Sequence, residues 1–229
     1  MSQIVLLDSD FSAMPSVVAE GRRVINNIER SASLFLVKNI FSFVLAIVSV
    51  FVAFRYPIQP VQMSLISTLT IGFPSFFLAL EPNKNLVRGG FLKNVLYRAV
   101  PAGLTDLFTV LGAVAFSFAF PLTGDEVSTI SLYLMAIVGF LMLFRVSRPF
   151  NRWRAAMCCT LAAVFVLAVV FIGDFLQLTA LSFGGWLVFA SLAMLAVPMI
   201  GYFTKGLDWL SAKYTALKRR ISRHKAEKN

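Results

Sequence analysis

The chain has 229 residues, of which 58% are hydrophobic and 14% are charged, and its formal net charge is +10 at pH 7. A soluble globular domain carries roughly 25% charged residues, so this composition excludes an ordinary soluble protein and favours an integral membrane protein. A basic chain can bind nucleic acid, but no nucleic-acid motif accompanies the charge, and we expect the basic residues to flank membrane spans and contact lipid instead.

The first predicted element is a short strand over residues 3–7 (QIVLL), an apolar and β-branched run typical of a buried parallel strand. Asp8 and Asp10 end this run, and Pro15 suits the first turn of a helix. A lone strand exposes an unpaired edge, so we expect it to pair with a sheet that these residues do not supply.

A polar amphipathic helix is predicted over residues 16–31, and no helix-ending residue separates it from the apolar block that starts at Ala32. We therefore expect one continuous helix. It would begin as a stalk outside the membrane and end across the bilayer near Phe54.

Six apolar stretches approach the ~20 residues that a helix needs to cross a bilayer. We expect spans at 32–54, 61–81, 99–120, 128–145, 155–173 and 183–203, followed by a basic tail at 205–229. Between the second and third spans, residues 83–98 alternate basic and apolar side chains, which fits either a helix on the membrane surface or an ordinary loop. The predicted fold is an all-α membrane protein with six transmembrane helices.

The charges predict how the spans are oriented. Basic residues gather in the tail and in one set of loops, whereas the opposite loops hold one arginine, Arg55, with Asp125, Glu126 and Asp174. Positively charged loops stay in the cytoplasm, so both termini are expected there, as an even number of spans requires. We expect a multi-pass protein of the plasma (inner) membrane, with anionic lipid at the basic tail.

Polar side chains inside the predicted spans are candidate functional residues, because ionisable and amide groups are costly in hydrocarbon. In the first span, Asn39 and Ser42 lie three residues apart and share a helix face. Lys38 is either functional or extends its amine to the interface. In the third span, Asp106 is either an ion or proton site or the partner of a polar group on another helix.

The second span combines several hydroxyl side chains with Gly72 and Pro74. Pro74 removes a backbone donor and clashes with the carbonyl of Thr70, so we predict a helix break there. A break would expose carbonyl oxygens beside Ser67 and Thr70, and such neutral oxygens suit a hard cation. A kinked packing helix whose hydroxyls bond to their own backbone explains the same residues.

Two motifs resemble the P-type cation-transporting ATPases. The segment IVLLDSDFSAMPSVVAEGRRVINNIERS, residues 4–31, is similar to the end of that family's phosphorylation domain and the helix that leads into its fifth transmembrane helix. The run TIGFPSFFLALEPN, residues 70–83, resembles the end of the sixth helix, and RAVPAGL, residues 98–104, fits the same bacterial, calcium-type branch. The residues that match the EGR-x-x-x-NN stalk pattern are Glu20, Gly21, Arg22, Asn26 and Asn27.

The resemblance implies an architecture and a set of cation ligands. Residues 1–15 would end the cytoplasmic phosphorylation domain, residues 16–31 would form the stalk, and residues 32–204 would be membrane helices five to ten. Asn39 and Thr70 match ligand positions of the family. Ser42 and Ser67 stand where its calcium pumps have glutamate and asparagine, so one ion held mainly by carbonyls and neutral oxygens is expected, with the fourth helix completing the site.

In that family, ATP with Mg²⁺ phosphorylates an aspartate in a DKTGT motif, and neither DKTGT nor the later GDGxND motif occurs in these residues. The resemblance therefore implies the C-terminal membrane module of an ATP-driven cation pump, with Ca²⁺ as the expected ion. The module would have no catalytic residue or cofactor of its own, would be inactive alone and would need the N-terminal half of the pump as a partner. The alternatives are a self-contained six-span channel or secondary transporter, and a membrane scaffold subunit.

Overall fold

A computed structural model describes residues 11–52, 54–81, 86 and 89–226 of the chain. The described residues form helices joined by short connections and contain no strand; the strand expected over residues 3–7 lies outside them. The elements are η1 (Phe11–Ala13), α1 (Met14–Val52), α2 (Pro60–Ser67), the π-helical η2 (Thr68–Gly72), α3 (Phe73–Leu80), α4 (Phe91–Ala119), α5 (Gly124–Val146), α6 (Arg152–Phe171) and α7 (Phe183–Ala226).

Six helices in the described part are long and apolar enough to cross a membrane, when α2, η2 and α3 are counted as one span from Pro60 to Leu80. The predicted all-α fold with six spans is therefore confirmed, and the chain is a multi-pass membrane protein. Within the segment over residues 83–98, residues 91–98 form the first turns of α4, which begins at Phe91.

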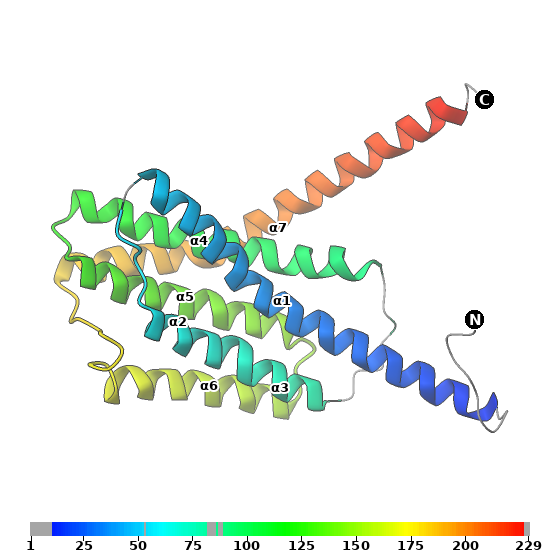
Figure 1. The fold of residues 1–229 in the computed structure, drawn as a ribbon, viewed down its shortest axis with the longest axis horizontal. Coiled ribbons are helices and arrows are strands. Elements are labelled where there is room, and N and C mark those ends of the chain that lie inside the picture. The colour runs from blue at the N-terminus through cyan, green and yellow to red at the C-terminus, as the bar shows by residue number, and fades with distance from the viewer. Residues whose placement is uncertain (1–10, 53, 82–85, 87–88, 227–229) are drawn as a thin grey trace.

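Helix α1 is continuous over 39 residues, as the sequence predicted. At ~1.5 Å per residue it is about 58 Å long, roughly twice the ~30 Å thickness of a bilayer core, so its N-terminal half extends outside the membrane. This half and the C-terminal half of α7 project from the same end of the bundle, as Figure 1 shows. We call this end the stalk end.

Helices α4 and α5 are the most enclosed of the six spans. Helix α4 packs against α1, α5 and α7, while α6 makes few contacts and lies at the edge of the bundle. The outer face of α6 presents exposed apolar side chains, among them Val166, Val170 and Phe171. Apolar residues facing outward from a helix whose backbone is internally bonded are suited to contact lipid tails.

Helices α1 and α4 approach closely at Gly103. A Cβ atom at this position would lie 3.0 Å from Cγ2 of Ile40 and 3.1 Å from the carbonyl oxygen of Val37. A side chain here would force Ile40 or the backbone of α1 to shift by a few tenths of an ångström, so Gly103 lets the stalk-bearing helix pack closely against the centre of the bundle.

The end of the bundle opposite the stalk is held by buried polar side chains. Gln62 is fully buried; its amide donates to the carbonyl of Leu176 at 3.1 Å, and its oxygen accepts from Ser128 Oγ at 2.8 Å. Glu126 Oε1 accepts from the backbone N–H of Ser182 at 2.8 Å. These bonds tie the loop between α6 and α7 to α2 and α5, which gives Gln62 a structural role.

Candidate functional site

The second span changes helix type where the sequence predicted a break. The backbone N–H of Phe73 donates to the carbonyl of Thr68, five residues earlier, and Pro74 lies in the first turn of α3. In an α-helix the carbonyl of Thr70 would need the N–H of residue 74, which a proline lacks. The wider π turn moves the bonding register past Pro74, so the chain remains helical through this point.

Two of the hydroxyl groups singled out in this span donate to their own helix. Ser67 Oγ donates to the carbonyl of Met63 at 2.7 Å, and Thr70 Oγ1 donates to the carbonyl of Ile66 at 2.8 Å. This is the bonding that the packing interpretation describes. A hydroxyl that has given its proton away still has oxygen lone pairs, so Thr70 keeps the capacity to act as a cation ligand.

A small cavity, which we call the Thr70 cavity, lies beside the π turn. Its volume is about 20 Å³, enough for roughly one water-sized group. Three of the polar residues singled out in the sequence line it together: Lys38 from α1, Thr70 from η2 and Asp106 from α4. The other lining residues are apolar or small: Leu34, Val37, Ile66, Ile71, Met135, Gly139 and Met142.

Asp106 is the most unusual group in this cavity. Its side chain is 3% exposed, and its Oδ1 atom has no hydrogen-bond partner among the described residues. The four ion pairs of the described chain include neither Asp106 nor the half-buried Lys38. A buried carboxylate without a partner is costly, so Asp106 is a candidate either to hold a proton itself or to bind a ligand that supplies positive charge or a hydrogen-bond donor.

Gly139 of α5 makes room for Thr70. A Cβ atom at Gly139 would lie 2.9 Å from Cγ2 of Thr70 and 3.3 Å from its Oγ1. The sequence analysis did not single out this residue, because a glycine in an apolar span carries no polar signal. Its importance depends on which helix packs opposite.

The remaining candidate ligands do not line the Thr70 cavity. Asn39 is exposed on the outer surface of α1, and Ser67 is half-buried on α2. Ser42 is half-buried and hydrogen-bonds to the hydroxyl of Tyr56. Within the described ranges no three His, Cys, Asp or Glu side chains are grouped closely enough to hold a metal ion.

The residues of the stalk motif differ in their burial and in their partners. Asn27 is buried and its Nδ2 donates to the carbonyl of Ala79 at 3.1 Å, which joins α1 to the end of α3. Glu20 is exposed and pairs with Arg23 on the same helix, with 3.2 Å between Oε1 and Nη1. Gly21 is exposed, whereas Arg22 and Asn26 are half-buried.

A second set of contacts anchors the stalk, and the sequence did not predict it. Glu29 is buried, and its Oε1 lies 3.2 Å from Nη2 of Arg98 while its Oε2 accepts from Asn94 Nδ2 at 3.1 Å. Both partners are on α4. The sequence showed Arg98 only as one of many basic residues near span ends, and nothing in the pattern paired it with Glu29.

A partly buried ion pair joins Glu81, the residue after α3, to α6. Arg154 Nε lies 2.5 Å from Oε2 of Glu81, and the guanidinium also donates to the carbonyls of Ser147 at 3.0 Å and Pro149 at 2.7 Å. Together with Asn27 and Glu29, this pair makes the stalk end a bonded junction of α1, α3, α4 and α6. The Thr70 cavity lies deeper along α1, at Lys38.

No protein-family model matches the chain. Curated bacterial proteins do: the calcium-transporting ATPase CtpE of Mycobacterium bovis is 33% identical over 97% of this chain and 30% of its own length. The probable cation-transporting ATPase exp7 of Streptococcus pneumoniae is 35% identical over 75% of this chain and 23% of its own. CtpE of Mycolicibacterium smegmatis is 35% identical over 74% of this chain and 23% of its own length. The chain thus spans about a quarter to a third of these relatives.

Proposed function

Because this chain is homologous over most of its length to bacterial cation-transporting P-type ATPases, we propose that it is the membrane module of an ATP-driven cation transporter. Its transported ion is Ca²⁺, because two of the relatives are calcium-transporting ATPases. The module lies in the plasma membrane with both termini in the cytoplasm, and its basic tail contacts anionic lipid.

The observation that carries this proposal is the unpartnered Oδ1 atom of Asp106 in the cavity beside Thr70. A cation would supply the missing partner, with the Thr70 hydroxyl as a neutral ligand. Ca²⁺ takes about six to eight oxygen ligands, more than these two side chains supply. The remaining ligands come from backbone carbonyls and from the other part of the transporter, which covers the exposed Asn39.

The stalk supplies the mechanical link. The same unbroken helix α1 carries Glu29 at the stalk-end junction and Lys38 at the cavity, nine residues apart, or about 13 Å along the axis. A displacement of the stalk therefore moves one wall of the cavity. ATP and Mg²⁺ act in the partner half of the transporter, because these residues hold no DKTGT motif, and the module is inactive alone.

The test is a chimera in which this chain replaces the corresponding part of M. bovis CtpE. We expect ATP-dependent Ca²⁺ uptake into inverted membrane vesicles. We also expect Thr70→Val and Asp106→Asn each to reduce uptake at least about tenfold, the effect of losing ~1.4 kcal/mol of ion binding. Thr109→Val is the matched control, because Thr109 is buried and donates to its own helix at 2.9 Å but lies outside the cavity.

Three outcomes would contradict the proposal. A well-expressed chimera without uptake would remove the pump assignment, and full uptake by both cavity variants would remove the cavity from the ion pathway. The isolated chain is expected to give no Ca²⁺ flux in liposomes; flux without ATP would favour a self-contained channel or secondary transporter.

A further inference from the structure

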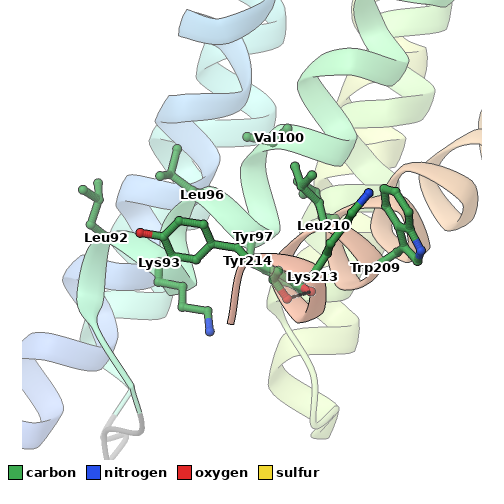
Figure 2. Close-up of a pocket in the computed structure, with 11 residues that line it drawn as sticks. Leu92, Lys93, Leu96, Tyr97, Val100, Trp209, Leu210, Lys213 and Tyr214 are labelled. Carbon is green, nitrogen blue, oxygen red and sulfur yellow. Dashed lines mark hydrogen bonds between the residues drawn. The ribbon is translucent and has the colours of Figure 1, made fainter. Parts of the chain in front are cut away.

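A large groove lies on the surface between the first turns of α4 and the part of α7 that follows its apolar span (Figure 2). Its volume is about 1110 Å³, comparable with the largest small-molecule pockets at roughly 1,000 Å³. The apolar lining is Leu92, Leu96 and Val100 from α4, with Leu207 and Leu210 from α7. We call it the α4–α7 groove.

The position of the groove along the helices places it at the membrane boundary. The apolar stretch of α7 ends near residue 203, about 20 residues after the helix begins at Phe183, which is the length of a bilayer core. Residues 205–214 therefore lie at the level of the lipid headgroups. The stalk end, where the groove lies, also carries the basic loops.

The polar lining is that of an interfacial site. Two lysines, Lys93 from α4 and Lys213 from α7, lie at the groove with Tyr97, Trp209 and Tyr214 (Figure 2). The Nζ atom of Lys213 is 4.8 Å from the centre of the Trp209 ring. Lysines with apolar stems and aromatic rings with one polar edge are the side chains that proteins place among headgroups.

Asp208 lies close to the groove, and its carboxylate is already engaged. Glu29, which lines a neighbouring pocket with Lys93, is paired with Arg98. The hydroxyl of Tyr97 donates to the carboxylate of Asp208, and it is 3.5 Å from Oγ of Ser211. This contact joins α4 to α7 across the groove. It leaves the two lysines as the charged groups of the lining.

We propose that the α4–α7 groove binds an anionic phospholipid, with the phosphate at the lysines that line the groove, Lys93 and Lys213, and the first carbons of the acyl chains against Leu96, Val100 and Leu207. Basic pockets between transmembrane helices are suited to anionic headgroups. An apolar protein segment would leave both ammonium groups without a counter-charge, and a zwitterionic lipid brings a cation of its own. The site uses none of the residues of the Thr70 cavity. It rests on the part of the proposed function that places the basic tail against anionic lipid, because Lys213 lies in that tail, and it does not depend on cation transport.

Trp209 provides a reporter inside the site. The chain has three tryptophans, and Trp153→Phe with Trp186→Phe leaves Trp209 as the only one. The whole chain carrying these changes is reconstituted in phosphatidylcholine vesicles that contain a small, fixed fraction of either brominated phosphatidylglycerol or brominated phosphatidylcholine. We expect the anionic lipid to quench Trp209 fluorescence at least twofold more strongly, and the difference to shrink as salt screens the charges.

The lysines are then removed as a pair. Lys93→Gln with Lys213→Gln is expected to abolish the preference for the anionic lipid while quenching by phosphatidylcholine persists. Arg152→Gln with Lys205→Gln is the matched control. It removes the same charge from two exposed residues at the same end of the bundle that do not line the groove, and it is expected to retain the preference.

Several results would overturn the proposal. Equal quenching by the two lipids, or a preference that survives loss of both lysines, would remove the anionic site. If neither lipid quenches Trp209, the groove is filled by protein, which is either a second copy of the chain or another segment of it. If inorganic phosphate in the buffer abolished the preference at constant ionic strength, the site would bind a free anion rather than a phospholipid.

Discussion

The side chain of Thr70 packs so closely against α5 that one added methyl group there would displace it. A Cβ atom added at Gly139 would lie 2.9 Å from the Cγ2 atom of Thr70 and 3.3 Å from its Oγ1 atom. The hydroxyl also bonds to the carbonyl of Ile66, so the side chain has a fixed rotamer and little room to turn. The position of a candidate cation ligand therefore depends on the absence of a side chain on the neighbouring helix.

We expect Gly139→Ala to lower the free energy of unfolding by ~1–2 kcal/mol, because Thr70 must move away from the added methyl group. Gly201→Ala is the control: it is also a helix-interior change, but nothing lies within 4 Å of its Cβ position. Alanine is the better helix former, so this variant should gain up to ~1 kcal/mol. Thermal unfolding in detergent, monitored by circular dichroism, measures the stability of both variants. If both variants gain stability, Thr70 moves away from the added methyl group at no cost.

Single residues could be identified from the sequence only where they were chemically conspicuous. Lys38, Thr70 and Asp106 are polar groups in apolar spans, and the cost of such groups in hydrocarbon marked each of them. Their meeting in one cavity could not be predicted, since it depends on how α1 and α4 pack against the π turn. Gly139 has no polar side chain to mark it, and nothing in the sequence distinguishes Glu29 from the exposed charges of the stalk helix.

At the scale of elements, α1 is anchored where it leaves the bundle. Glu29 is 4% exposed and bonds to Asn94 and Arg98 of α4, and Asn27 bonds to the end of α3. Because α1 continues unbroken to Lys38, these bonds set the angle at which the stalk meets the membrane part. A weaker junction would loosen both the helix packing and the link to the cavity.

Glu29→Ala is expected to lower the free energy of unfolding by ~1–3 kcal/mol, since it removes a buried, charge-assisted hydrogen bond and leaves Asn94 without this acceptor. Half-exposed Arg98 adds little, because water screens its charge. Glu20→Ala makes the same change at an exposed site of the same helix and should cost less than ~0.5 kcal/mol. Chemical denaturation in mixed micelles compares the two; equal costs would argue against an anchored stalk.

Element boundaries followed hydropathy in some places and departed from it in others. The continuous α1 was predictable because no proline follows Pro15 in its first turn and no glycine follows Gly21. The sequence ended the last span at residue 203, where apolar residues give way to lysine and arginine, yet α7 continues to Ala226. Polarity marks where a helix leaves the membrane. It does not mark where the helix ends, because alanine, leucine, lysine and arginine are all good helix formers.

At the scale of the whole molecule, the two long extensions of α1 and α7 project from one end of the bundle (Figure 1). The basic loop before α6 lies at this end, where Arg152 is exposed, and the loop between α6 and α7, with exposed Asp174, lies at the other. The fold thus separates the charges along its axis. Positive charge is retained on the cytoplasmic side, so this separation predicts which end faces the cytoplasm.

Cysteine labelling tests this orientation directly. The two native thiols are removed by Cys158→Ala and Cys159→Ala, and a single cysteine is placed at Arg152 or at Asp174. We expect a membrane-impermeant maleimide to label only the Asp174→Cys protein in intact cells, and both proteins after the membrane is permeabilised. Labelling of Arg152→Cys in intact cells would place the stalk end outside the cytoplasm. Neither α1 nor its ties to α3 and α4 could then transmit a cytoplasmic ATP-driven movement to the Thr70 cavity.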